Sequence, residues 1–331
     1  MQLIGIKRTF TIFSFIVVLI SSCIQTKNEN KSNSISWIRF YWEGDTIGGK
    51  YYEKLAMFVP FRIEGIPYKF TSQLDFGAPS TMVYGNTFMP VLKNFPNIAR
   101  KLDTLKKKYV IQGKEMGGFN NISFYLDTVL FKNQKIALFK NYGDTMSSNN
   151  LKKDTVLHIG TIGSNLFKGK ILAIDFLNKK FAVFDSLPEH TEDNLTDIII
   201  KNGRIKVPII INSEKVYVLY DTGSSFASLY LSTKNWNKYR DTTSTLDSIM
   251  ITAWGTKYPL FISKTNIEIK IGNIVFRPKT IMANNLAPYY NFYKKEKIIG
   301  LMGNQLFYDK ILLIDFKNNK FGLVNNQQLI R

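Results

Sequence analysis

One segment of the chain occurs twice, and this duplication constrains the fold more than any other feature. Residues 159–184, IGTIGSNLFKGKILAIDFLNKKFAVF, align without a gap with residues 299–324, IGLMGNQLFYDKILLIDFKNNKFGLV. About half of the positions match, far above chance for two segments of average composition. The offset is 140 residues (299 − 159), too long for a solenoid repeat, so the sequence predicts a duplicated domain.

Weaker similarities extend the repeat towards the N-terminus. Val59-Pro60 matches Val207-Pro208, and an Asp-x-Gly triplet follows in each half, at residues 75–77 and 221–223. The chain has 331 residues, which suits two domains of ordinary size. We therefore expect an N-terminal lobe over 36–190 and a C-terminal lobe over 191–331.

Within each half the pattern indicates strands rather than helices. Short β-branched and aromatic runs are interrupted by Gly, Asn, Asp and Pro, and residues 171–176, 216–220 and 311–316 are continuous apolar stretches typical of buried strands. Helical signals are few: we expect a helix within Asn86–Leu102 and helical turns at residues 165–167 and 304–307. The predicted fold is mainly β.

The first 23 residues have the order of a secretory signal. Lys7 and Arg8 precede an apolar run from Phe10 to Ile20, which is too short for a membrane-spanning helix. Residues 24–35 are polar and rich in Lys, Asn and Ser, which favours a flexible tether. The folded part is expected to begin at residue 36.

The end of this segment carries the only cysteine of the chain, Cys23. Ile20-Ser21-Ser22-Cys23 resembles the bacterial lipobox, and the resemblance implies that Cys23 is acylated and becomes the mature N-terminus. The protein would then be a lipoprotein of the cell envelope, held by its acyl chains on the outer membrane or another periplasmic face. The alternative is an ordinary signal peptide with an incidental cysteine.

Composition excludes several kinds of site. One cysteine cannot form an intramolecular disulfide, and two scattered histidines provide neither a zinc cage nor a histidine-based triad, so we expect no metal and no cofactor. The net charge of +19 favours anionic surfaces, but its lysines form no basic stripe, so we expect no nucleic-acid partner. A polyanion-binding surface protein stays a hypothesis that depends on charge alone.

Each half places one carboxylate where an apolar strand ends, followed two residues later by glycine. These residues are Asp75 with Gly77 and Asp221 with Gly223. Glycine permits a tight turn and a close approach of the backbone. Duplication would bring the two carboxylates face to face, and carboxylates about 3 Å apart share one proton because both cannot ionise. Such a pair can activate water without a metal.

These motifs carry a family resemblance. Asp221-Thr222-Gly223-Ser224 resembles the Asp-Thr-Gly signature of pepsin-like and retroviral-type aspartic peptidases. Each half also has their downstream hydrophobic-hydrophobic-Gly element, ending at Gly163 and Gly303. The resemblance implies a two-lobed acid-protease fold with a pseudo-twofold axis, a monomer, a peptide or protein substrate, and catalysis by Asp75 and Asp221. It implies that the loop residues support them: Phe76, Gly77, Ala78, Thr222, Gly223, Ser224, Gly163 and Gly303.

The first lobe departs from this pattern. Phe76 replaces the threonine whose hydroxyl grips the other lobe in the family, and Ala78 replaces a serine or threonine that supports the carboxylate. Ser80 or Thr81 could compensate. The prediction is an aspartic endopeptidase. The alternative is a catalytically impaired pseudoenzyme that binds peptides or glycans.

The family covers its substrate with a β-hairpin called the flap. In the first lobe the candidate is Gln112–Asn121, including Gly117, Gly118 and Phe119. In the second lobe Trp254 and Gly255 fall at the corresponding place, although a plain hairpin with a core tryptophan fits equally well. The repeated Asp175 and Asp315 precede hairpin turns and are expected to be structural.

Overall fold

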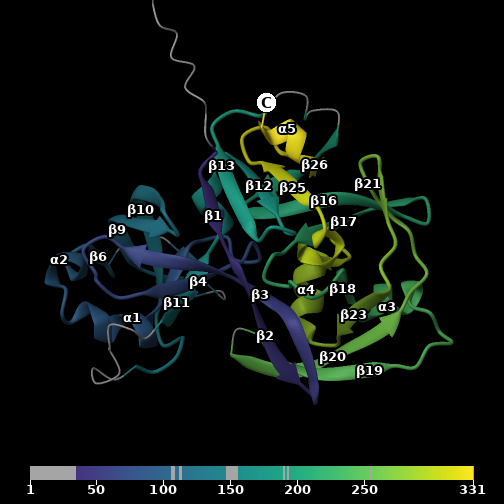
Figure 1. The fold of residues 1–331 in the computed structure, drawn as a ribbon. Coiled ribbons are helices and arrows are strands. Elements are labelled where there is room, and N and C mark those ends of the chain that lie inside the picture. Colours follow the sequence, from purple (N-terminus) through teal and green to yellow (C-terminus); the bar gives the residue numbers. More distant parts are fainter. Residues whose placement is uncertain are drawn as a thin grey trace, which may run out of the picture. The chain divides into compact units, whose positions relative to one another are not determined.

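Strands dominate the computed structural model (Figure 1), which describes residues 35–105, 109–111, 114–146, 156–188, 191, 194–253 and 255–330. The predicted signal segment, Cys23 and nearly all of the predicted tether lie outside these residues. Ile35–Arg331 is one compact unit. The expectation of a mainly β, two-lobed fold is confirmed.

The first lobe is built on an eight-stranded sheet. Its order is β2 (Tyr41–Ile47), β3 (Lys50–Ile63), β4 (Phe70–Leu74), β11 (Leu157–Ile162), β5 (Met82–Tyr84), β10 (Val129–Phe139), β9 (Gly118–Leu126) and β6 (Leu102–Asp103). A separate hairpin joins β7 (Tyr109–Ile111) and β8 (Lys114–Met116). Alternating buried residues along β9 face the core, as expected for a sheet with one solvated face.

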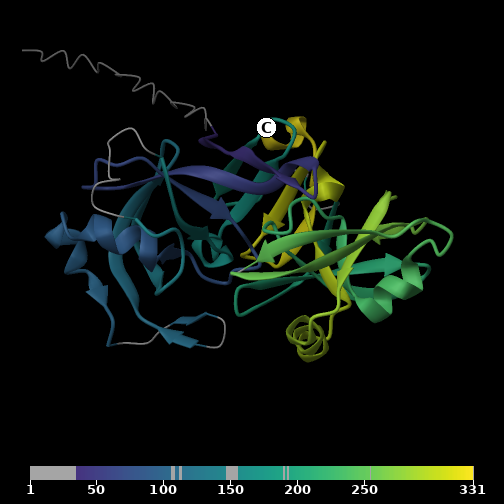
Figure 2. The ribbon, with the colours of Figure 1, turned by 90° about the horizontal axis from the view of Figure 1, so that it is seen from below.

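The second lobe is built on a ten-stranded sheet. Its order is β19 (Asp247–Ala253), β20 (Thr256–Lys264), β23 (Thr280–Asn284), β18 (Leu229–Ser232), β24 (Gly300–Met302), β17 (Glu214–Tyr220), β16 (Arg204–Ile211), β21 (Ile269–Ile271) and β22 (Ile274–Phe276), with β15 (Ile199–Lys201) beside β16. Figure 2 shows the elements of the two lobes on opposite sides of the view.

The strand pairing around the two Asp-x-Gly loops is the same in both lobes. β4 and β17, which precede the loops, pair in parallel with β11 and β24. β5 and β18, which follow the loops, pair antiparallel with the same two strands. The duplicated sequence has therefore folded into duplicated connectivity.

A six-stranded sheet joins the two halves. Its order is β1 (Trp37–Arg39), β13 (Lys180–Phe184), β12 (Ile171–Asp175), β25 (Ile311–Asp315), β26 (Lys320–Val324) and β14 (Leu195–Asp197). At its centre the two copies of the repeat pair antiparallel, and the equivalent residues Ala173 and Leu313 lie opposite each other. A twofold relation between the complete lobes stays a prediction.

The helices are short. The helix expected within Asn86–Leu102 is interrupted, giving α1 (Gly85–Leu92) and α2 (Pro96–Ala99), because the residue before Pro96 cannot readily stay helical. The turns expected at 165–167 and 304–307 are the 3-10 helices η2 (Ser164–Phe167) and η4 (Asn304–Phe307).

Three further helices were not predicted: α3 (Thr233–Tyr239), α4 (Ala287–Glu296) and α5 (Asn326–Ile330). Within the described ranges, no helix combines the length and the apolar composition needed to cross a bilayer.

The repeated aspartates of the central sheet cap turns. Asp175 accepts hydrogen bonds from the Asn178 backbone (3.0 Å) and side chain (2.7 Å). Asp315 does the same for the Lys317 and Asn318 amides, each at 2.8 Å. Both carboxylates are buried and fully engaged, so their role is structural, as expected.

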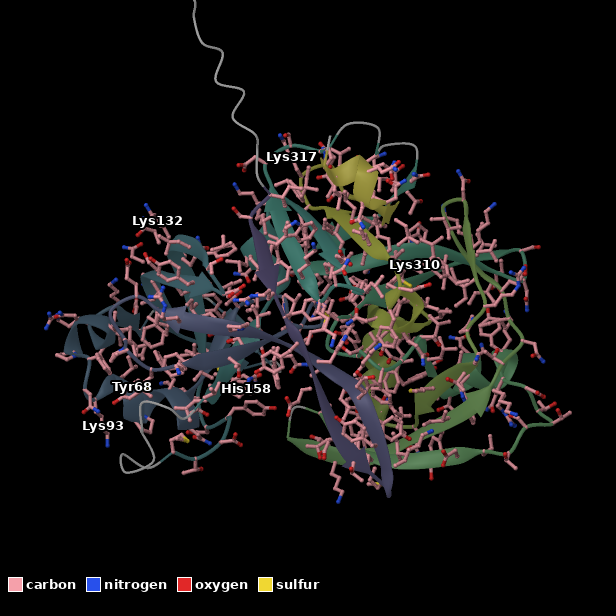
Figure 3. All side chains as sticks on the ribbon, in the orientation of Figure 1. Tyr68, Lys93, Lys132, His158, Lys310 and Lys317 are labelled. Carbon is pink, nitrogen blue, oxygen red and sulfur yellow. The ribbon has the colours of Figure 1, made fainter. Side chains whose placement is uncertain are left out.

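The lysines are spread over the surface. Figure 3 labels Lys93, Lys132 and Lys317, which lie on well-separated parts of the unit. Several lysines and arginines are paired with carboxylates, such as Lys206 with Glu296 at 2.8 Å. The positive charge is thus distributed over both lobes.

Candidate active site

Each candidate catalytic aspartate follows the last residue of a buried strand. The Asp75 amide donates to the Ile162 carbonyl (3.1 Å), and the Asp221 amide donates to the Met302 carbonyl (2.9 Å). β4 thus continues its parallel pairing with β11 for one residue beyond the strand, as far as Asp75. β17 does the same with β24, as far as Asp221. The position of both carboxyl groups is set by the two sheets rather than by flexible loops.

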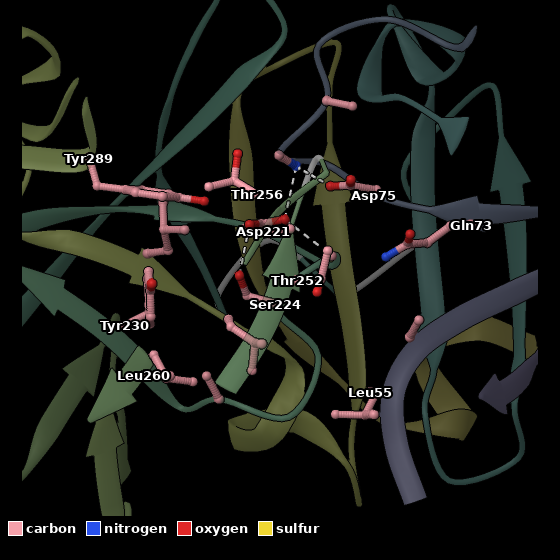
Figure 4. Close-up of a pocket in the computed structure, with 18 of the residues that line it drawn as sticks. Leu55, Gln73, Asp75, Asp221, Ser224, Tyr230, Thr252, Thr256, Leu260 and Tyr289 are labelled. Atoms are coloured by element: carbon pink, nitrogen blue, oxygen red, sulfur yellow. Dashed lines mark hydrogen bonds between the residues drawn. The ribbon is translucent and has the colours of Figure 1, made fainter. Parts of the chain in front are cut away.

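The two carboxyl groups meet at the seam between the lobes. They share one hydrogen-bond donor. The Gly77 amide donates to Oδ1 of Asp75 (2.8 Å) and to Oδ1 of Asp221 (3.0 Å), and the Gly223 amide donates to Oδ1 of Asp221 (2.8 Å). Figure 4 shows the pair with these bonds at the floor of the cleft. The two side chains predicted to pair are therefore brought together around the Gly77 amide.

The environment of the pair favours one shared proton. Asp75 and Asp221 are only 7% and 8% exposed, respectively. Burial, and next the charge of Asp221, raise the pKa of Asp75 well above its usual range. Besides its bonds from the loop amides, Asp221 accepts a hydrogen bond from the Ser224 hydroxyl at 2.9 Å. Asp75 is therefore suited to carry the proton and Asp221 to carry the charge.

Glycine is required in both loops because each lies against the opposite carboxylate. A Cβ atom at Gly77 would lie 2.7 Å from Oδ1 of Asp221, and one at Gly223 would lie 2.6 Å from Oδ1 of Asp75. Neither carboxylate can retreat without losing its hydrogen bonds. The two glycines thus permit the contact between lobes that brings the carboxyl groups together.

Gly163 and Gly303 lie directly against the backbone of the same two loops. A Cβ atom at Gly163 would lie 2.4 Å from the Ser80 carbonyl carbon, and one at Gly303 would lie 2.0 Å from the Ser224 carbonyl oxygen. The hydrophobic-hydrophobic-Gly elements therefore let the chain pass directly beneath the aspartate loops.

The Thr222 hydroxyl links the lobes beneath the carboxyl groups. It accepts from the Phe76 amide and donates to the Leu74 carbonyl, both at 2.9 Å. Thr222, Leu74 and Phe76 are each at most 1% exposed. Phe76, at the equivalent position of the first lobe, has no hydroxyl that could form the corresponding hydrogen bonds to the second lobe.

Phe76 fills the place of the missing threonine with aromatic packing. Its ring meets Phe167, Tyr220 and Phe316 edge to face, with centroids 5.7–6.1 Å apart. Tyr220 comes from the second lobe, and Phe316 from the sheet that joins the halves. The loop that lost a cross-lobe hydrogen bond has gained cross-lobe apolar contacts.

The compensation expected from Ser80 or Thr81 does not occur. The Thr81 hydroxyl donates to the Asn165 side chain (3.0 Å) and accepts from the Gly163 amide (3.2 Å). Within the described structure neither Ser80 nor Thr81 bonds to Asp75, which instead accepts from the backbone of Ala78. Thr81 supports the loop and not the carboxylate.

Asn304 is a supporting residue that the sequence analysis missed. It is fully buried, accepts from the Tyr220 hydroxyl (2.8 Å), and donates to the Thr222 carbonyl (3.1 Å) and the Ser225 hydroxyl (3.0 Å). It directly follows the repeated Gly303, and the equivalent position of the first lobe is Ser164. This repeated polar position after the glycine was a signal that could have identified it.

The carboxyl pair opens into a cleft with a volume of about 1030 Å³. Three hairpins contribute to its walls: β2–β3 with Asp45, Ile47 and Leu55, β7–β8 with Val110, and β19–β20 with residues 250–253, 256, 258 and 260. The β2–β3 hairpin also reaches the second lobe, where Tyr52 packs against Phe226 with ring centroids 5.8 Å apart. Neither this hairpin nor its contact was predicted.

The flap residues expected in the first lobe belong to its core. Gly117, Gly118 and Phe119 are buried, and Phe119 packs against Phe88. A Cβ atom would lie 2.4 Å from the Asp103 carbonyl oxygen at Gly117, and 2.3 Å from the Ile136 carbonyl oxygen at Gly118. These glycines permit close strand packing and not hinge motion, so this part of the flap prediction is wrong.

The second-lobe hairpin lies over the cleft. Trp254 falls outside the described residues. Gly255 is exposed with φ +79°, and an ideal Cβ there would lie 3.7 Å from the Tyr142 ring of the first lobe. The β19–β20 hairpin thus reaches from the second lobe to the first.

A buried histidine lies behind the first-lobe wall. His158 on β11 packs against Phe58 (centroids 4.6 Å apart) and Tyr84 (5.3 Å), and Tyr84 lines the cleft. Its Nδ1 atom has no hydrogen-bond partner in the described structure. Burial lowers the pKa of His158 to about 4, so the ring is neutral near pH 7.

Across the described ranges, no three His, Cys, Asp or Glu side chains gather in a way that could hold a metal ion.

Comparison with known proteins adds little to this description. No protein-family model matches the chain, and no curated protein matches it. Among solved structures, basic 7S globulin from soybean is similar to it, with 10% sequence identity and a TM-score of 0.40 over 87% of this chain and 95% of the globulin chain. Function is therefore argued from the site.

Proposed function

We propose that this protein is an aspartic endopeptidase that hydrolyses peptide bonds with Asp75 and Asp221. The observation that carries the proposal is that one backbone amide, Gly77, donates to both of these buried carboxyl groups at the floor of a cleft that is open to solvent. A pair held in this way has one proton to donate and one charge to accept a proton.

The chemistry follows from this division. Ionised Asp221 takes a proton from a water molecule, whose oxygen attacks the peptide carbonyl carbon. Asp75 donates its proton to the carbonyl oxygen, which gives a neutral tetrahedral intermediate. The C–N bond then breaks as the nitrogen takes the proton from Asp221. One hydroxyl of the intermediate returns its proton to Asp75 as the carbonyl re-forms, which gives a carboxylic acid and an amine and restores the pair. The three donors on Asp221, from Gly77, Gly223 and Ser224, stabilise its charge between steps.

We also propose that the protein works at the cell envelope as a lipoprotein acylated on Cys23. The lipobox-like residues 20–23 support this. Metabolic labelling with an alkyne fatty acid should mark the wild-type protein, and Cys23→Ala should lose both the label and its place in the membrane fraction. Equal labelling of the two would contradict acylation at this residue.

A reduced and carboxymethylated protein is the substrate for the activity test, because an unfolded chain can enter the cleft in extended form. The full-length protein should cleave it between about pH 3 and 8, the range in which a coupled carboxyl pair can titrate. A statine-containing peptide, which carries a tetrahedral hydroxyl in place of the peptide carbonyl, should inhibit the cleavage. Absence of cleavage over this range would refute the proposal.

The second candidate is a peptide-binding pseudoenzyme. The one-sided grip of Thr222 and the loss of a hydroxyl at Ala78 favour it, because both weaken support on the Asp75 side. The same unfolded protein distinguishes the two candidates: a binding protein should retain it on a column at every pH without producing new amino termini.

A further inference from the structure

One wall of the cleft carries a row of tyrosine hydroxyls beside the carboxyl pair. Tyr230, Tyr258 and Tyr289 line the cavity on the side of the second lobe. Tyr230 and Tyr258 are only 5% and 3% exposed, whereas Tyr289 on α4 is half-buried. Figure 4 shows the Tyr289 hydroxyl pointing towards Asp221. Apolar side chains such as Leu260, Met282 and Phe292 make up much of this wall, together with the polar Thr252 and Thr256 and with Arg204, which is paired with Glu296.

Hydrogen bonds position these hydroxyls from two sides. The Leu286 amide donates to the Asn284 side-chain oxygen (2.9 Å), which turns the Asn284 amide nitrogen towards the Tyr230 hydroxyl, and this nitrogen donates to it. The Tyr258 and Tyr289 hydroxyls are hydrogen-bonded to each other with their oxygens 3.1 Å apart.

The Tyr258–Tyr289 bond leaves Tyr289 with unused hydrogen-bonding capacity. A hydroxyl group has one proton and two acceptor positions, and this bond uses only one of the three on each oxygen. Because Tyr289 lines the cleft, a ligand there can use what remains.

Tyr289 stays protonated over the whole range in which the carboxyl pair could work. Burial raises the pKa of Tyr289 above its usual value, and the negative charge of Asp221 raises it further. The cleft therefore presents a neutral hydroxyl beside an acidic pair on a largely apolar wall.

These features select one kind of ligand group. An aliphatic or phenylalanine side chain would pack against the apolar residues of the wall but leave the Tyr289 hydroxyl without a further partner. A carboxylate would provide a partner but would be repelled by the charge on the Asp75–Asp221 pair. A tyrosine side chain satisfies both requirements, because its ring packs on the apolar residues and its hydroxyl can either donate to Tyr289 or accept from it.

We propose that Tyr289 is a specificity-determining residue, and that the second-lobe wall of the cleft selects peptides with tyrosine next to the bond that is cleaved. The selection extends to other large side chains with a neutral acceptor at the tip, such as glutamine. This inference rests on the proposed function for the cleavage step, but the recognition step needs only the cleft.

Four pools of decapeptides test the proposal. The pools share mixed flanking residues and differ in one fixed central residue, which is Tyr, Phe, Gln or Leu. Cleavage by the full-length protein is followed through new amino termini, and binding is followed by retention on the immobilised Asp75→Asn, Asp221→Asn double variant. The wild-type protein should favour the Tyr pool over the Phe pool by about tenfold, the effect of one hydrogen bond of ordinary strength.

The Tyr289→Phe variant should bring the ratio of the Tyr pool to the Phe pool close to one. Tyr290→Phe is the matched control, since Tyr290 is the next residue of the same helix, is 55% exposed, and does not line the cleft. This control should keep the wild-type ratio. Changing the fixed residue to Gln should give an intermediate preference that Tyr289→Phe also removes.

The outcomes separate this inference from the proposed function. Cleavage of all pools without a Tyr preference, or a preference that survives Tyr289→Phe, would overturn the inference and leave the peptidase standing. Selective retention of the Tyr pool without cleavage would support the inference and refute the peptidase. Neither cleavage nor retention of any pool would overturn both.

Discussion

Thr222→Val removes the hydrogen bonds by which the Thr222 hydroxyl joins the two aspartate loops across the lobes. Valine has nearly the shape of threonine but replaces the hydroxyl with a methyl group. It removes the acceptor of the Phe76 amide and the donor to the Leu74 carbonyl, and both partners are buried in the seam. No water can replace the hydroxyl without opening this seam.

The expected cost follows from those two groups. Each buried backbone group that loses its partner costs about 1–3 kcal/mol, so the free energy of unfolding should fall by about 2–6 kcal/mol. Thr222→Ser is the matched control because it keeps the hydroxyl and removes one buried methyl, which costs on the order of 1 kcal/mol. Cleavage should also suffer more in the valine variant, because the grip lies directly beneath Asp75 and Asp221.

Urea unfolding of the full-length protein in detergent, followed by tryptophan fluorescence and far-UV circular dichroism, gives the free energies. Coincidence of the two probes checks that the transition is cooperative. A valine variant no less stable than the serine variant would refute the argument that the Thr222 hydroxyl holds the lobes together.

Three further predictions follow. Phe76→Thr restores the family residue but should lower the free energy of unfolding by about 2–4 kcal/mol in the same assay, because the loss of a buried ring outweighs the gain of one hydrogen bond. A gain in stability would show that the aromatic packing is unimportant. In Gly77→Ala the new Cβ atom would displace the Asp221 carboxylate. An ångström-scale displacement of a reacting group should lower kcat/KM at least about a hundredfold. Wild-type kinetics would contradict the close approach of Gly77 to Asp221. Burial lowers the pKa of His158 from 6.5 to about 4, so its neutral ring stabilises the folded state fully above pH 6.5, and this contribution is lost as the pH falls to 4. Over that interval the free energy of unfolding of the wild type should fall by up to about 3 kcal/mol relative to that of His158→Phe. Parallel pH profiles of unfolding for the two proteins would contradict this.

The duplication explains why so much of the site could be predicted from sequence. Asp75, Asp221 and their glycines lie in short motifs whose surroundings repeat in both halves, and local strand-and-loop geometry determines where each carboxylate points. Because the two halves meet through equivalent strands, the repeat also predicts that the carboxylates face each other. The Thr222 contact follows from the same geometry.

The walls of the cleft were harder to predict. The Tyr230, Tyr258 and Tyr289 hydroxyls come from three separate elements and gather on one wall only when the second lobe is folded. No spacing along the sequence reveals such a set. The same holds for the β2–β3 hairpin, whose reach to the second lobe depends on tertiary packing.

Glycine misled the prediction of the first-lobe flap for a physical reason. The absence of a side chain permits either flexibility or close packing, and sequence alone does not distinguish them. At Gly117 and Gly118 the backbone of neighbouring segments occupies the space of a Cβ atom. Phe76 shows the converse, since its departure from the family motif is compensated by aromatic neighbours that lie far away in the sequence.

In the proposed mechanism Asp75 and Asp221 act as one catalytic unit, and a double-mutant cycle measures how strongly they depend on each other. The measurement is kcat/KM on one cleavable peptide for wild type, Asp75→Asn, Asp221→Asn and the double variant. If the pair shares one proton, each single variant should lose at least about a thousandfold, and the double variant should lose no more than either single one. Losses that multiply, or a single variant that retains most of its activity, would contradict a shared catalytic role for the two carboxyl groups.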